Sequence, residues 1–236
     1  APLFASVRPG LGRLVERLEE ALRARGVALR LGAPVSRLPD ARAVVLATPA
    51  PAAAGLVEPA SPDAAAGLRA IDYASVALAV LVYPAAALAR RLDGTGFLVP
   101  ASEGRLLTAC SFGSSKWPHW AEPGEVVLRA SAGRWGDERA LGLADTELTE
   151  RLHGELVAAL GLREEPRAVR VARWPAAFPQ YRPGHLERVA GVEAALARDL
   201  PGVELAGAGY RGVGIAACIA QGRAAARRAL VSLARA

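Results

Sequence analysis

The sequence predicts an α/β plus α+β fold, in which the two chain ends build one domain and a sheet-rich middle forms an inserted second domain. Near the N-terminus, apolar residues at helical spacing are followed by a short β-branched strand, Ala43–Ala47. Near the C-terminus, the strand Val203–Ala206 leads through a glycine turn into a helix. The patterns of alternating strand and helix therefore lie at the two ends of the chain, whereas the middle is rich in extended segments.

The N-terminal helix is the first element that the spacing predicts. Its apolar stripe consists of Leu11, Leu14, Val15, Leu18 and Leu22. Gly26 stands where a C′ glycine would end the helix. We then expect two short extended pieces, Val27–Leu31 and Val35–Leu38, as a hairpin-like pair. Alanine, proline and glycine dominate residues 49–70, which indicates a linker with short helices.

The middle of the chain predicts an antiparallel or mixed sheet. Its expected strands are Tyr73–Tyr83, Gly96–Pro100, Arg105–Phe112 and Glu125–Ser131. Further along, a helix is expected to begin with Asp145 as its cap and to end at Gly161. The strand Ala168–Trp174, the helix His185–Asp199 and a final helix to about Leu233 complete the order.

Length and composition allow two domains with real cores. The chain has 236 residues, of which 52% are hydrophobic and 22% charged, so intrinsic disorder is excluded. We expect residues 1–48 and 183–236 to form one domain and residues 49–182 the other. No methionine occurs, even at position 1, which suggests that Ala1 is not a natural start.

The net charge of +6 does not predict a nucleic-acid partner, because the basic residues are scattered along the chain. The N-terminal arginines alternate with glutamates, as on a solvated helix face. The densest basic block, Arg223–Arg235, falls on the final helix. An anionic ligand or a membrane surface fits this pattern better, and peripheral membrane contact stays open.

Neither cysteine nor histidine predicts a metal site or a catalytic group. Cys110 and Cys218 lie far apart, without metal-ligand spacing, and are expected to be buried thiols in a reducing, cytoplasmic compartment. His153 is expected to be exposed in mid-helix, and His185 to pack or cap a helix. His119 lies in a tryptophan-rich turn, and we nominate no catalytic residue. The longest apolar run is too short to span a membrane.

A glycine turn gives the strongest local motif. Gly207, Gly209 and Gly212 spell GxGxxG between a strand and a helix. No second strand follows this helix, and no acidic residue lies about 20 residues further on, so we reject the motif as a primary dinucleotide loop. Two interpretations stay open: a turn that brings backbone amides to a flat or anionic ligand, and a turn required only for packing.

The order of several motifs resembles the protoporphyrinogen/coproporphyrinogen oxidase family. The matching stretches are Gly10–Val15, Ala47–Pro49, Gly96–Glu103, Trp174–His185 and Leu205–Ile219. The resemblance implies an FAD enzyme that oxidises a porphyrinogen with O2 in haem biosynthesis. It covers the C-terminal half of that family or slightly more, so the FAD-binding, Rossmann-like domain is expected to be incomplete and the chain alone inactive.

The resemblance also assigns residues. Val35, Gly207, Val213, Gly214 and Ile215 are expected to contact FAD, with Val35 on the adenine-binding strand. Phe97 and Leu98 are expected to contact the substrate. Three cations, Arg105, Lys116 and Arg134, are guesses for the rim of a tetrapyrrole slot.

Two other functions remain open from the sequence. The first is a flavin amine oxidase or desaturase-like enzyme on the same flavin domain. The second is a binding protein that lacks catalysis. The residues themselves do not decide between coproporphyrinogen and protoporphyrinogen as the substrate. Coproporphyrinogen has four propionates and protoporphyrinogen two, so many cations at the rim would favour coproporphyrinogen.

Overall fold

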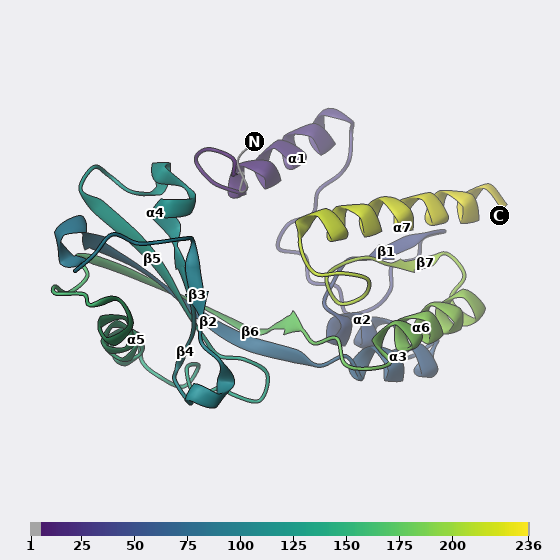
Figure 1. Cartoon of the computed structure of the whole chain (residues 1–236). Coiled ribbons are helices and arrows are strands. Elements are labelled where there is room, and N and C mark those ends of the chain that lie inside the picture. The colour runs from purple at the N-terminus through teal and green to yellow at the C-terminus, as the bar shows by residue number, and fades with distance from the viewer. Residues whose placement is uncertain (1–5, 236) are drawn as a thin grey trace. The chain divides into compact units, whose positions relative to one another are not determined.

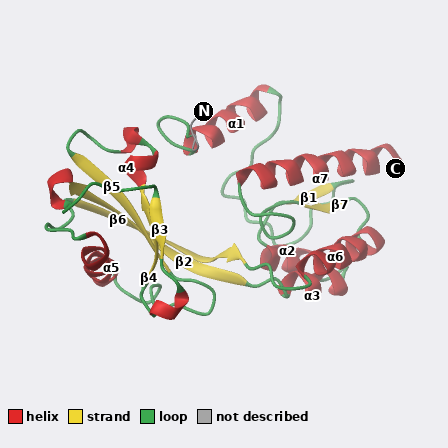
Figure 2. Ribbon diagram, in the orientation of Figure 1, coloured by secondary structure: helices red, strands yellow, loops and turns green. Residues whose placement is uncertain are grey.

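The computed structural model describes residues 6–235, which form a mixed α/β structure of two compact units (Figures 1 and 2). Unit 1 comprises residues 6–34, 77–132 and 143–172. Unit 2 comprises residues 35–76, 133–142 and 173–235. The functional domain boundaries expected after residues 48 and 182 stay a prediction. Ala1, which the sequence questions as a start, lies outside the described residues.

A five-stranded sheet of order β3-β4-β5-β2-β6 confirms the sheet predicted for the middle of the chain. Its strands are β2 (Tyr73–Pro84), β3 (Gly96–Leu98), β4 (Leu107–Phe112), β5 (Glu125–Ala132) and β6 (Ala168–Pro179). The pairs β3–β4, β4–β5 and β5–β2 are antiparallel. Short connections favour this arrangement for β3–β4 and β4–β5, which are consecutive in the sequence. Short helical turns connect them: η1 (Ala85–Ala87), η2 (Ala101–Glu103), α4 (Gly113–Lys116) and η3 (Pro118–Trp120).

One face of this sheet packs against α5 (Asp145–Leu160), which lies beside the strands in Figure 1. The helix buries a stripe of leucines spaced four residues apart: Leu148, Leu152, Leu156 and Leu160. The helix ends at Gly161 with φ +68°, as predicted. Its start differs slightly, because Ala144 occupies the cap position and Asp145 is the first helical residue. At this position the Asp145 carboxylate interacts favourably with the positive end of the helix dipole.

The opposite face of the sheet is only partly covered, and we call it the open face. Alternation along the strands places on it Leu78, Val80, Leu98, Ala109, Ser111, Arg129 and Ser131. All of these side chains are half-buried or exposed, whereas their neighbours toward α5 are almost all buried. Unit 1 therefore has one closed face that supplies its core and one face that remains accessible.

The sheet has two edge strands, β3 and β6, within the described residues. β3 is three residues long, whereas β6 has twelve. Ala176, near the end of β6, has φ +44°, which is unusual for a residue with a Cβ. Its N–H donates to the buried Ser75 hydroxyl at 2.9 Å, and Ser75 donates to Glu138 at 2.9 Å. These bonds hold the left-handed residue in place.

Unit 2 contains a parallel pair of strands, β1 (Val44–Leu46) and β7 (Val203–Leu205). The pair joins a segment from the N-terminal part of the chain to one from the C-terminal part. Its helices are α2 (Ala50–Val57), α3 (Pro62–Arg69), α6 (His185–Asp199) and α7 (Ile215–Arg235). The short helices predicted for residues 49–70 are present, but this segment is no linker. One side of each short helix is buried in the core of the unit, and α3 packs against α6. The buried residues are Ala50, Ala53, Ala54, Val57, Ala64, Ala65 and Leu68.

The N-terminal region is partly as predicted. The helix α1 (Gly12–Ala24) forms, and Gly26 follows it with φ +74°. The two extended pieces expected at Val27–Leu31 and Val35–Leu38 form no strands, and the expectation of a hairpin-like pair is wrong. A strand needs a neighbour for its backbone hydrogen bonds, and neither piece finds one among the described residues. Both pieces expose large side chains instead. No helix in the described part of the chain is long and apolar enough to cross a membrane.

Candidate functional site

The glycine turn between β7 and α7 has the backbone shape that the sequence predicts. Gly207, Gly212 and Gly214 have φ values of +133°, +127° and +114°, which residues with a Cβ rarely adopt. A Cβ on Gly209 would lie 2.5 Å from the hydroxyl of Tyr73. The turn therefore requires glycine for two reasons, backbone conformation and close approach.

The Tyr181 hydroxyl fixes this turn from outside. It donates to the carbonyl of Ala208 at 2.6 Å and accepts from the N–H of Gly212 at 2.8 Å. Its ring stacks on His185 with ring centroids 3.8 Å apart. One side chain thus links both arms of the turn, at positions four residues apart.

His185 supports the same turn from the interior. It is 4% exposed, and its Nε2 lies 2.8 Å from the carbonyl oxygen of Tyr210. Because a carbonyl only accepts, Nε2 carries the proton. Nδ1 is buried and has no hydrogen-bond partner among the described residues. These contacts confirm the packing role expected for His185.

Gln221, in the second turn of α7, contacts the glycine turn as well. Its Oε1 accepts from the N–H of Arg211 at 3.2 Å, and its Nε2 donates to the carbonyl of Gly212 at 3.3 Å. Arg211 in turn pairs with Glu193 of α6 at 2.5 Å. The sequence motifs include Tyr181, but no local pattern assigns Tyr181 or Gln221 to the turn, because their partners lie elsewhere in the sequence.

The outer side of the turn is accessible and apolar. Val213, Ile215 and Ile219 are 47%, 52% and 47% exposed, and no atom lies within 4 Å of a Cβ placed on Gly214. The first N–H groups of α7 lack helical partners, as at every helix start. Exposed amides beside exposed aliphatic side chains suit a flat ring with polar edges. The turn brings together four of the five predicted FAD contacts: Gly207, Val213, Gly214 and Ile215.

Val35, the fifth predicted FAD contact, belongs to the same unit but lies in a loop. The strand expected there is absent, and the side chain is 61% exposed. Its accessibility leaves its predicted role open to test.

Buried tyrosines give the inner side of the turn a neutral character. The Tyr73 hydroxyl accepts from the N–H of Ala50 at 2.9 Å, and burial raises its pKa above the ordinary value. Burial likewise raises the pKa of Tyr210, which is 2% exposed. Neither phenol ionises near neutral pH, so the two tyrosines add no charge to the inner side of the turn.

The two predicted substrate residues, Phe97 and Leu98, point to opposite faces of the five-stranded sheet. Phe97 meets Phe112 edge-on, with centroids 6.1 Å apart, and lines a pocket of about 310 Å³ beside α5. Leu98 lies on the open face and is 83% exposed. Strand alternation separates neighbouring residues in this way, so the pair does not form one wall of a slot.

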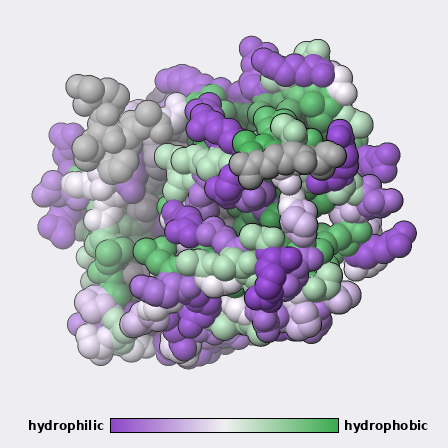
Figure 3. Space-filling view, turned by 90° about the vertical axis from the view of Figure 1, so that its right-hand side faces the viewer, coloured by the Kyte–Doolittle hydropathy of each residue, from purple (hydrophilic) through white to green (hydrophobic). Residues whose placement is uncertain are grey.

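The three guessed rim cations do not belong to one compact unit. Arg105 lies 3.9 Å from Glu103, and the Lys116 ammonium lies 5.9 Å from the centre of the Trp117 ring. Arg134 belongs to unit 2. On the face drawn in Figure 3, hydrophilic residues are interspersed with hydrophobic ones.

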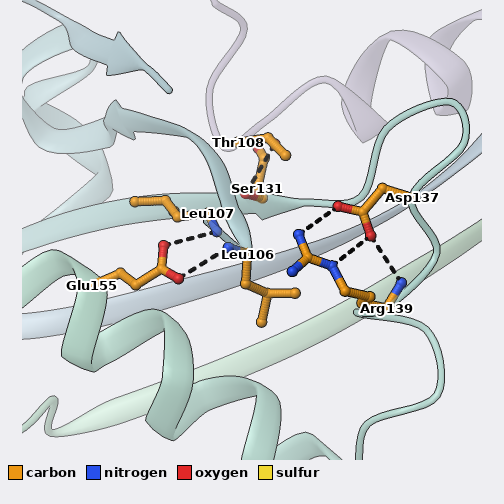
Figure 4. Close-up of polar contacts among 7 residues, drawn as sticks. All are labelled: Leu106, Leu107, Thr108, Ser131, Asp137, Arg139 and Glu155. Atoms are coloured by element: carbon orange, nitrogen blue, oxygen red, sulfur yellow. Dashed lines mark hydrogen bonds and ion pairs between the residues drawn. The ribbon is translucent and has the colours of Figure 1, made fainter. Parts of the chain in front are cut away.

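Glu155 of α5 fastens the helix to the start of β4 (Figure 4). Its carboxylate accepts from the N–H groups of Leu106 and Leu107 at 2.9 and 3.0 Å. Figure 4 also shows Asp137 holding Arg139 through both carboxylate oxygens, and this pairing lowers the pKa of Asp137. Glu155 thus connects α5 to the sheet.

His153 is not exposed, contrary to the sequence prediction. Its side chain is 12% accessible, because α5 presents it to the sheet, where Nδ1 lies 2.9 Å from the hydroxyl of Tyr83. Nε2 lies 3.1 Å from Glu165. Cys110 is buried as expected, and burial raises the pKa of its thiol to about 12. Cys218 is only half-buried, contrary to the expectation that both thiols are buried.

Replacing Tyr181 by phenylalanine is expected to lower the free energy of unfolding of unit 2 by about 1–2 kcal/mol. Phenylalanine keeps the ring stack but loses the bonds to Ala208 and Gly212. Thermal unfolding measures the loss. Tyr73→Phe, which removes the hydroxyl that bonds the N–H of Ala50 on the inner side of the turn, is the comparison variant. An unchanged midpoint for Tyr181→Phe would show that the turn is held without it.

Comparison with known proteins places the chain in a family. Coproporphyrinogen III oxidase of Bacillus subtilis is 33% identical over 246 residues, covering 98% of this chain and 52% of the relative. Coproporphyrinogen III oxidase of Mycobacterium bovis is 39% identical over 187 residues, covering 78% of this chain and 40% of the relative. This chain therefore spans about half the length of these relatives.

A solved structure from Exiguobacterium sp. 255-15, described provisionally as a protoporphyrinogen oxidase, has the same fold with a TM-score of 0.81. It is 28% identical, and the match covers 97% of this chain and 52% of the other. Residues 3–230 match the model of the family described as flavin containing amine oxidoreductase, and the chain belongs to that family.

Proposed function

We propose that this chain belongs to an FAD-dependent enzyme that oxidises a porphyrinogen, coproporphyrinogen III or protoporphyrinogen IX, to the porphyrin in haem biosynthesis, with O2 as the acceptor. The observation that carries the proposal is the accessible glycine turn at the start of α7. The turn lies in a chain whose relatives are named for this oxidation. Because the chain spans about half their length, the activity concerns the whole enzyme.

The residues of the turn fit the edge of a flavin. The backbone at Gly214 is exposed and has room beside it, and Val213 and Ile215 present aliphatic surface on either side. We assign Gly207, Val213, Gly214 and Ile215 to this contact, and Val35 to the adenine end. When bound, the flavin would accept electrons from the substrate and deliver them to O2.

The contribution of the chain itself is binding and orientation. Tyr181, His185 and Gln221 hold the turn in one shape, so the amides at the start of α7 have a fixed direction. His185 and His153 are both engaged in structural contacts. We therefore assign no general acid or base to this chain.

The middle segment, residues 49–182, is proposed as the substrate domain, and the two ends as parts of the FAD domain. Phe97 and Leu98 would then meet different ligand groups, since they lie on opposite faces of the sheet. A cytoplasmic enzyme with peripheral membrane contact would suit a substrate that carries both propionates and an apolar ring.

The test measures flavin content and activity in the protein encoded by the full reading frame. We expect bound FAD by absorbance, and the formation of fluorescent porphyrin and hydrogen peroxide from either porphyrinogen in air. Gly214→Val should weaken FAD binding by roughly tenfold or more, because its φ of +114° disfavours a Cβ and its surface is the proposed contact. Gly222→Ala, within α7 and with open space around it, is the control. Oxidation of amines without porphyrin formation would contradict the proposal.

A further inference from the structure

The open face of the five-stranded sheet holds one cation in its middle. Arg129 of β5 lies between Val80 of β2 and Ser111 of β4, which are its neighbours in register. Hydrogen-bonded strands lie on both sides of it, so its side chain projects from the centre of the sheet rather than from an edge.

The Nε atom of Arg129 is buried and makes no hydrogen bond among the described residues. The nearest acidic residue on the same face of β5 is Glu125, four positions along the strand, at a distance of about 13 Å for extended backbone. A buried donor without a partner is costly, and native proteins usually satisfy such a group. The position of Arg129 therefore indicates a ligand that accepts hydrogen bonds.

The surroundings specify the kind of acceptor. A guanidinium offers Nε and one terminal nitrogen side by side, which matches the two oxygens of a carboxylate. The nearby face is built from aliphatic side chains, Leu78, Val80 and Leu98, with the hydroxyls of Ser111 and Ser131 between them. Such a surface suits a flat apolar molecule that carries a carboxylate.

One end of the open face is already covered. Val127 is 5% exposed, and a Cβ on Gly113 of α4 would lie 3.1 Å from the Val127 carbonyl and 3.2 Å from the Trp120 ring. Arg129 is the next residue on this face, and the face is more accessible toward Ser131 and Leu98. Arg129 thus lies at the boundary between covered and accessible surface, where an anchoring charge is reachable.

We propose that Arg129 is a specificity-determining residue that binds a carboxylate of the tetrapyrrole, with the ring lying along the open face. This inference rests on the proposed function and deepens it, because it assigns the recognition of substrate carboxylates to a residue of this chain. It also replaces the guessed rim cations Arg105 and Lys116, whose side chains interact with Glu103 and Trp117.

The experiment compares two porphyrins that share one ring and differ in whether the four carboxylates are free or esterified. Coproporphyrin III and its tetramethyl ester are titrated against the full-length protein in the same dilute detergent, with quenching of protein fluorescence as the readout. The wild type is expected to bind the acid at least tenfold more tightly than the ester. Arg129→Gln should weaken binding of the acid by roughly tenfold and leave the ester within about twofold.

Two further variants control for folding and for general charge effects. Arg129→Lys keeps the charge and the aliphatic stem but loses the paired donors, and its affinity for the acid should fall between those of the wild type and Arg129→Gln. Arg151→Gln removes an arginine of α5, where Arg151 pairs with Glu147 at 2.6 Å, and should change neither titration. Equal loss of the acid in Arg151→Gln and Arg129→Gln would overturn the assignment.

The outcomes separate the two proposals. If Arg129→Gln binds the acid as tightly as the wild type, Arg129 is not the anchor, whereas the porphyrin function stands. If Arg129→Gln loses acid and ester equally, Arg129 supports the shape of the sheet and the carboxylate contact is refuted. If the wild type binds neither porphyrin, the substrate class proposed for the enzyme fails together with its anchor.

Discussion

Replacing His185 by alanine is expected to lower the free energy of unfolding of unit 2 by about 3 kcal/mol. The substitution removes a side chain that is 4% exposed and leaves the carbonyl of Tyr210 without its donor. It also removes the ring on which Tyr181 stacks. Because both contacts support the glycine turn, the loss should extend to Gly212 and the start of α7. Urea unfolding measures the stability, and amide hydrogen exchange shows where protection is lost.

The neighbouring residue provides the matched control. Leu186 is 55% exposed at the start of the same helix, and Leu186→Ala should change the unfolding free energy by less than about 0.5 kcal/mol. His185→Gln keeps a donor and should recover part of the loss. A His185→Ala protein as stable as the Leu186→Ala protein would show that the buried contact with Tyr210 contributes little.

Replacing Glu155 by alanine is expected to destabilise unit 1 by about 2–4 kcal/mol. The carboxylate is the acceptor for two neighbouring backbone N–H groups, those of Leu106 and Leu107, and both residues are buried. Hydrogen bonds to a charged acceptor are stronger than neutral ones, so their joint loss should exceed that of an ordinary side chain. Urea unfolding followed by far-UV circular dichroism measures the change.

A graded series sharpens this test. Glu155→Gln retains one acceptor oxygen and should lose about half as much stability as Glu155→Ala. Glu150→Ala, an exposed position on the same helix, controls for helix propensity and should have little effect. If Glu155→Gln and Glu155→Ala were equally stable, the hydrogen bond that glutamine retains would contribute nothing.

Periodicity in the sequence predicts most of the regular elements. The leucines of α5 repeat at helical spacing and are all buried, and the alternating residues of β2 and β5 are strands. The predicted strands at Val27–Leu31 and Val35–Leu38 fail for a physical reason. Their β-branched residues favour extended backbone, but a strand also needs a neighbour to pair with, and local sequence does not specify one.

The composition of residues 49–70 misleads in a different way. Alanine and glycine suggest a loose linker, yet small side chains allow α2, α3 and α6 to pack closely. A Cβ on Gly67 would lie 2.5 Å from the Val192 side chain. Small residues at a helix contact and small residues in a linker have the same composition, and only their spatial partners distinguish them.

The candidate site was predictable in its backbone but not in its supports. The glycines at 207, 212 and 214 indicate a turn with positive φ, which the structure confirms. The Tyr181 hydroxyl bonds residues 27 and 31 positions away, so no local pattern reveals its role. Alternation within a strand does place Phe97 and Leu98 on opposite faces, and Arg129 on the same face as Ser131.

The edge strands of the five-stranded sheet also influence whether two copies of the molecule can pair edge to edge at high concentration. An exposed edge is a template for pairing with another chain, and long flat edges promote aggregation. β3 offers only three residues, with Gly96 at φ +143°. The longer edge, β6, contains arginines at 170 and 173 and prolines at 175 and 179, and Ala176 bends its backbone into the left-handed region. Proline cannot donate to an added strand, so this chain carries its own protection against edge-to-edge association.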